Sequence, residues 1–186
     1  MLGAPAITAG RSPLAVGFMI WLGSELMFFA GLFATFITLA AENDAWPPAG
    51  VHLETGRTAI FTIVLLTSSV TVHFAVHAAD HLNRRAAGAW LAATVALGAV
   101  FLANQGLEYA ELDFWIDDHA YGTIFYLLTG FHGLHVLGGL VLLALLTRDV
   151  VSDATTRSTE HIRIGSWYWH FVDVVWVGVF LLVYVL

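Results

Sequence analysis

The sequence contains no cysteine and no lysine, and it carries little charge of either sign. Its seven basic residues are all arginines, and charged residues make up 11% of the 186 residues, against about 25% in an average globular protein. A chain without cysteine forms no disulfide, iron–sulfur cluster, thiolate metal site or cysteine nucleophile. With seven basic against fourteen acidic residues, the chain also lacks the basic surface that binding to nucleic acid requires.

Hydrophobic residues, by contrast, account for 59% of the chain. They are concentrated in five segments long enough to span a bilayer as a helix, which takes about 20 residues: about 14–41, 58–79, 86–110, 120–147 and 164–186. A soluble fold has too little polar surface to cover so much apolar area, whereas helices in a bilayer satisfy their own backbone polar groups. The sequence therefore predicts an all-α polytopic membrane protein, with a tail at residues 1–13 and one five-helix transmembrane domain at residues 14–186.

The arginines are distributed unequally between the two ends of these spans. Six of them fall on the side of the N-terminus: Arg11, Arg84, Arg85, Arg148, Arg157 and Arg163. Arg57 alone falls on the other side. Since basic residues collect on the cytoplasmic side, we expect a cytoplasmic N-terminus and an external C-terminus. The first span is about twice as long as the apolar region of a secretory signal, so we expect it to be retained.

Several ionisable residues lie inside the predicted spans, where an unpartnered charge costs roughly 2.5–3.5 kcal/mol on insertion scales. Glu25 and Asp173 lie near mid-span, and Glu108 lies at the outer end of the third span, where we expect it to reach the interface. The histidines within spans are His73, His77, His132, His135 and His170. Each of these groups needs a partner, a neutral state or a site lined by protein.

Helical spacing groups these residues further. His73 and His77 are four residues apart, so they share a helix face. His132 and His135 are three apart, as are His170 and Asp173, which are spaced to form a charge-assisted hydrogen bond. Histidines in this pattern bind metals in some proteins, but interhelical hydrogen bonding is the favoured interpretation here. Glu25 alone is compatible with a proton carrier, with a lipid or substrate contact, and with a buried acid bonded to a neighbouring helix.

Five segments together resemble cytochrome c oxidase subunit III. They are Ser24–Gly31, Trp46–Pro48, Gln105–Tyr109 followed by Tyr121–Gly122, Thr129–Val136, and Trp167–Trp176. The resemblance runs from about Gly17 to the C-terminus. With its five spans, the chain is most similar to the short bacterial form of the family.

This resemblance implies a subunit of a haem–copper oxidase in the bacterial plasma membrane that passes electrons from cytochrome c to dioxygen and pumps protons. In the family, subunit III is not catalytic and holds no metal or other redox cofactor, because haem and copper belong to subunits I and II. It docks on subunit I, binds phospholipids and supports proton uptake. The resemblance leaves open whether the oxidase joins a cytochrome bc complex.

The resemblance also implies roles for individual residues. The family's intramembrane glutamate falls on Glu25, a candidate for lipid binding or proton-uptake support together with His77, Arg84 and Arg85. The other polar residues of the spans are candidates for contacts within the membrane: His73, Glu108, His132, His135, His170 and Asp173. The longer family form has two helices before the glutamate-bearing one, and it often has adjacent histidines where this chain has Val76 and His77.

Three alternatives remain open from the sequence. A quinol oxidase subunit III also has five spans, although its members usually lack the acid at Glu25. The accessory protein of nitric-oxide reductases often lacks the run Trp167–His170. The third alternative belongs to a different functional class: a self-sufficient transporter that uses Glu25 and Asp173 as ion sites. Five spans without an internal repeat disfavour this alternative.

Overall fold

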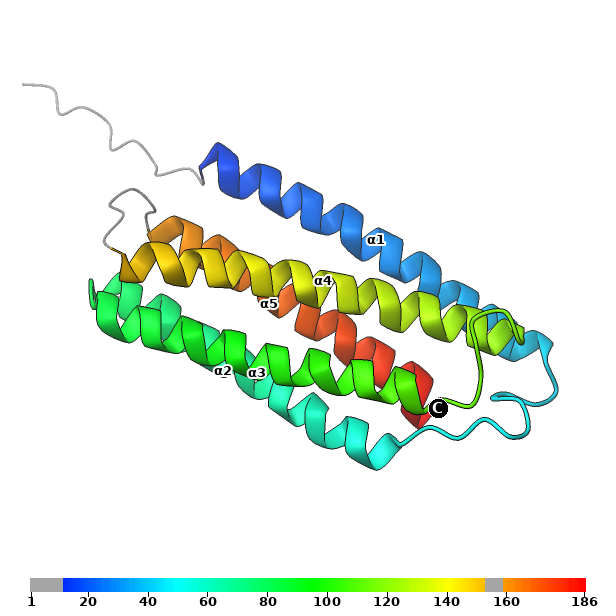
Figure 1. The fold of residues 1–186 in the computed structure, drawn as a ribbon. Helices are drawn as coiled ribbons and strands as arrows, with labels where there is room; N and C mark the ends of the chain where they lie inside the picture. The colour runs from blue at the N-terminus through cyan, green and yellow to red at the C-terminus, as the bar shows by residue number, and fades with distance from the viewer. Residues whose placement is uncertain (1–11, 153–158) are drawn as a thin grey trace, which may run out of the picture.

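The computed structural model describes residues 12–152 and 159–186, which form five long helices and a terminal helical turn (Figure 1). The helices are α1 (Pro13–Glu42), α2 (Thr55–Asp80), α3 (Arg84–Glu111), α4 (Ala120–Val151) and α5 (Thr159–Phe180), which continues into η1 (Leu181–Val185). All five are long and apolar enough to cross a membrane. The predicted all-α, five-helix fold is confirmed for this part of the chain. Most of the predicted N-terminal tail, together with Arg11 and Arg157, lies outside the described residues.

Helices α2, α3, α4 and α5 form a four-helix bundle, and α1 lies outside it against α4 and α5 (Figure 1). Short linkers make consecutive helices antiparallel, as expected for neighbours in a bundle. One end of the bundle therefore collects the beginnings of α1, α3 and α5 with the ends of α2 and α4. The opposite end carries the two longer linkers, residues 43–54 and 112–119, and the C-terminus.

Three helices begin at polar residues that cap free backbone N–H groups, which helix ends otherwise leave unpaired. The Ser12 hydroxyl accepts from the amide of Ala15 at 3.2 Å, ahead of Pro13 in the first turn of α1. Asn83 caps α3 in the same manner. The Nδ1 atom of His119 caps α4 at 2.7 Å from the amide of Gly122.

The bundle core is closed around Trp169 of α5, which is fully buried. Its indole N–H donates to the Ser68 hydroxyl of α2 at 2.8 Å. A Cβ atom at Gly98 of α3 would lie 2.5 Å from this ring, and one at Gly139 of α4 would lie 2.8 Å from it. Glycine at both positions therefore lets three helices approach one large aromatic ring. Gly139 of α4 therefore serves packing within the chain.

Helix α1 is held to the bundle along one side only. Phe29 and Phe36 are its fully enclosed aromatic residues. Trp21 stacks on Tyr168 of α5 with ring centroids 5.7 Å apart, and Phe33 fits against Gly178. The rest of α1 is largely exposed, so most of its surface is left for lipid or for another protein.

Candidate functional site

The deepest polar contact of α1 joins it to α4. Glu25 lies near the middle of α1, and its Oε2 atom is 3.2 Å from Nε2 of His135. The two side chains are 24% and 16% exposed, so the contact is partly shielded. His135 is fixed on its other side, because its Nδ1 atom lies 2.7 Å from the carbonyl oxygen of Phe131. The structure thus gives Glu25 a specific partner on a neighbouring helix.

This geometry requires a proton between Glu25 and His135. A carbonyl oxygen only accepts hydrogen bonds, so Nδ1 of His135 carries a hydrogen toward Phe131. Its Nε2 atom then either donates to a carboxylate or accepts from a carboxylic acid. Both arrangements place one proton on the contact and leave the pair without net charge. A neutral pair avoids most of the cost of a charge at mid-membrane.

His132, one turn before His135, has a different environment. It is fully buried, with its ring 4.8 Å from Trp176 of α5 and 6.1 Å from Phe101 of α3 between centroids. Among the described residues, neither of its ring nitrogens has a hydrogen-bond partner. Our prediction of an interhelical hydrogen bond for His132 is therefore wrong here, because aromatic rings from both neighbouring helices surround the imidazole.

A second polar cluster joins α2 to α5 near the middle of both helices. The Ser69 hydroxyl donates to Oδ2 of Asp173 and lies 2.8 Å from Nδ1 of His170. We expected His170 and Asp173 to bond to each other, but the structure connects them through Ser69. Asp173 is 3% exposed, and its other oxygen has no partner among the described residues. Asp173 is therefore a buried acid near the middle of its helix.

The row of histidines on α2 continues from this cluster along an exposed face. His73, one turn after Ser69, is exposed and lies close enough to His170 for electrostatic interaction. His77 and His81 follow at the next turns, with ring centroids 4.3 Å apart. The described residues contain no group of three or more side chains placed to hold a metal ion.

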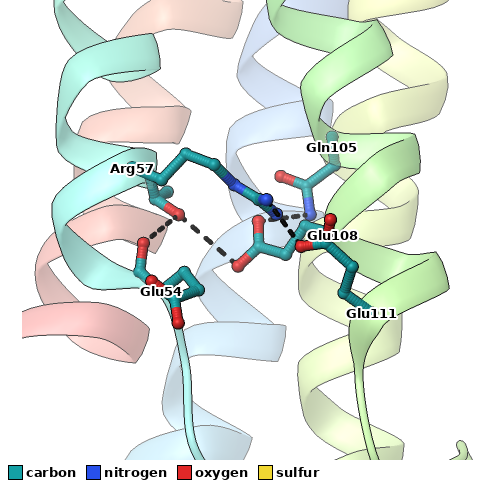
Figure 2. A network of polar contacts seen from close by, with 6 residues as sticks. Glu54, Arg57, Gln105, Glu108 and Glu111 are labelled. Atoms are coloured by element: carbon teal, nitrogen blue, oxygen red, sulfur yellow. Dashed lines mark hydrogen bonds and ion pairs between the residues drawn. The ribbon is translucent and has the colours of Figure 1, made fainter.

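A third cluster surrounds Glu108 near the opposite end of the bundle (Figure 2). Gln105 donates to one carboxylate oxygen at 3.3 Å, and Thr58 of α2 donates to the other at 3.4 Å. Arg57 approaches from α2 and pairs with the more exposed Glu111 at 2.5 Å. Glu108 is only 2% exposed, so our expectation that it reaches the interface is wrong. The α2–α3 packing encloses it.

The arginine-rich end of the bundle is also linked by polar contacts. Arg84 and Arg85 are both exposed at the start of α3, and Arg84 donates to the carbonyl of Val150 at 3.1 Å. Arg163 of α5 pairs with Asp80 of α2 at 2.8 Å.

Sequence reasoning missed the neutral partners of these acids. Ser69, which bonds to Asp173, and Thr58, which bonds to Glu108, were not singled out. The one available signal was spacing, because Ser69 lies four residues before His73 on the same helix face.

A family model described as cytochrome c oxidase subunit III matches residues 3–186. The chain belongs to this family. The probable cytochrome c oxidase subunit 3 of Nocardia farcinica is 44% identical over 176 residues, covering 92% of this chain and 87% of that relative. The cytochrome c oxidase subunit 3 of Thermostichus vulcanus is 35% identical over 173 residues, covering 92% and 86%.

A longer member of the subunit III family, from Scyliorhinus canicula, is 40% identical over 179 residues, which cover 92% of this chain and 69% of that relative. Membership makes the chain a multi-pass membrane component of an oxidoreductase complex that contains other oxidase subunits. The resemblance drawn from the sequence motifs is confirmed.

Proposed function

We propose that the chain is the non-redox subunit III of an aerobic terminal oxidase in a bacterial plasma membrane. The complex transfers electrons from cytochrome c to dioxygen and pumps protons, and its haem and copper belong to subunits I and II. The observation that carries the proposal is the family match over residues 3–186, supported by relatives named as probable or known cytochrome c oxidase subunit 3. The N-terminus faces the cytoplasm, because six arginines fall on that side.

Within the complex, the chain docks on subunit I, retains phospholipid and supports proton uptake. Glu25 and His135 are suited to this role, because they place an exchangeable proton at the seam between α1 and α4, 3.2 Å from atom to atom. Arg84, Arg85 and His77 provide polar groups at the headgroup level, where each basic residue contributes on the order of 1 kcal/mol with anionic lipid.

The test is an affinity purification of the tagged chain from its own membranes in mild detergent, followed by visible spectroscopy. We expect haem absorption that comes from larger co-purified subunits, and oxygen consumption with reduced cytochrome c. A preparation that oxidises quinol but not cytochrome c would show that quinol, and not cytochrome c, is the electron donor. A chain that purifies alone, carries its own haem, or drives solute flux in liposomes would overturn the proposal.

A further inference from the structure

One surface of the bundle exposes polar side chains at mid-membrane depth. Ser69 and His73 of α2 and His170 of α5 lie together there, with Asp173 behind them; we call these four residues the α2–α5 polar face. Ser69 and Asp173 both lie near the middle of their helices. His73 is exposed, and Ser69 and His170 are partly exposed, with all other described helices in place. Helix α1 packs on α4 and α5 and does not cover His73.

Apolar side chains frame this polar face. Leu66 and Val70 of α2 are 40% and 52% exposed, and Val174 of α5 is 68% exposed. Leu66, Val70 and His73 follow one another at helical spacing, and Val174 lies one turn after His170. The surface therefore has a hydrogen-bonding centre and a hydrophobic border.

Hydrocarbon chains are a poor covering for such a centre. At mid-depth a bilayer offers neither water nor headgroups, so an exposed imidazole there is left without hydrogen-bond partners. Interhelical hydrogen bonds from histidine, serine and similar side chains are among the interactions that hold membrane helices together. The chemistry that satisfies the α2–α5 polar face is therefore a polar side chain on another transmembrane helix.

We propose that the α2–α5 polar face is the surface on which a transmembrane helix of the haem-bearing partner subunit docks, with a hydrogen-bonding side chain of that helix against His73 and His170. This inference rests on the proposed function and adds to it which face of the chain meets the partner. Asp173 and Ser69 act behind the contact, since their hydrogen bonds hold His170 in place.

Site-specific photo-crosslinking in the assembled complex tests the docking face. A photoreactive amino acid replaces Val70 or Val174, which border the polar face and leave its four residues intact. The control position is Val100, which is 49% exposed and lies near the middle of α3, a helix that contributes no residue to the polar face. We expect crosslinks from positions 70 and 174 to the haem-bearing subunit, identified by mass spectrometry, and none from position 100.

Other products overturn the inference. These are adducts at 70 and 174 with lipid alone, adducts with a second copy of this chain, and a crosslink from position 100 that is as strong as those from 70 and 174. The proposed function fails separately, because in that case no haem-bearing subunit co-purifies in the first place. If the subunit co-purifies but the crosslinks arise elsewhere, the docking face alone is wrong.

A pair of substitutions at His73 provides a second measurement. His73→Leu keeps the bulk but removes the hydrogen bonds, whereas His73→Asn keeps a donor and an acceptor. We expect the Leu variant to leave the solubilised complex about threefold faster, the effect of an average hydrogen bond between membrane helices, and the Asn variant to resemble the unmodified chain. Equal dissociation of the Leu variant and the unmodified chain would contradict the inference.

Discussion

Glu25 and His135 hold one proton between them across 3.2 Å, although 110 residues separate them in the sequence. The contact is neutral in both of its protonation arrangements, since the carbonyl of Phe131 fixes the hydrogen on the other ring nitrogen. It is the polar link between α1 and the bundle at this depth. Substituting either partner therefore tests how α1 is attached to the bundle, without changing the core around Trp169.

Glu25→Ala leaves the imidazole of His135 without its interhelical partner, at a cost of about 1–3 kcal/mol for a partly buried group. We expect electron transfer to persist and the enzyme to lose activity faster during sustained turnover, with less phospholipid retained. Oxygen consumption followed to inactivation, with phosphorus analysis of the purified complex, measures both effects.

Glu25→Gln is the matched control for that change. The glutamine amide donates to a bare Nε2 atom and keeps the contact neutral, so we expect lipid content near that of the unmodified complex. Activity during sustained turnover should still decline, because an amide does not exchange a proton as a carboxyl group does. If Glu25→Ala instead abolishes assembly of the oxidase, the residue has a folding role and the proposed role in proton uptake is wrong.

Gly98→Ala is expected to destabilise the bundle, because the added Cβ would lie 2.5 Å from the Trp169 ring and 2.9 Å from Leu140. Overpacking of this kind costs about 1–3 kcal/mol. Gly106→Ala, on the same helix, adds a Cβ with no atom within 4 Å and should be neutral or slightly stabilising. Unfolding in detergent, followed by tryptophan fluorescence, separates the two. Equal stability of the variants would contradict the close packing.

Ser69→Ala removes the hydroxyl that joins Asp173 to His170. Because Asp173 is buried and its other oxygen is unpartnered among the described residues, we expect a loss of about 1–3 kcal/mol in the free energy of unfolding. Thr67→Ala, two residues earlier, removes an exposed hydroxyl that bonds only within its own helix and should change little. A similar loss in both variants would show that the bridge is unimportant.

Glu108 and Glu111 allow a comparison of a buried acid with an exposed one at the same end of α3. Glu108→Ala removes the carboxylate that accepts from the buried Gln105 amide and one of the two acceptors of the Thr58 hydroxyl, with an expected cost of about 1–3 kcal/mol. Glu111→Ala breaks an ion pair whose acid is 57% exposed, and exposed pairs contribute less than about 1 kcal/mol. Thermal denaturation should show a larger loss of stability for Glu108→Ala than for Glu111→Ala, and the reverse order would contradict the burial of Glu108 between α2 and α3.

The helices were predictable because the bilayer imposes one strong rule. A segment such as residues 58–79 contains no acidic or basic residue and is long enough to span, so its state follows from length and composition. The structure extends it to Thr55–Asp80, where polar residues at each end continue the helix. Hydropathy carries no information about such ends.

The partners of the polar residues were less predictable. Spacing placed His170 and Asp173 on one face, but it could not reveal that Ser69 of another helix stands between them. Glu108 is near a helix end in the sequence, yet the packing of α2 against α3 encloses it. Both outcomes depend on how each helix is rotated about its axis relative to its neighbour. Residue spacing within one helix does not determine that rotation.

The placement of α1 outside the bundle has a consequence for biosynthesis. Chains are made from the N-terminus, so α1 leaves the ribosome before α4 and α5, the two helices against which it packs. Glu25 therefore has no hydrogen-bond partner in His135 until about 110 further residues have been made. An insertion factor that shelters an acidic helix would act during that interval.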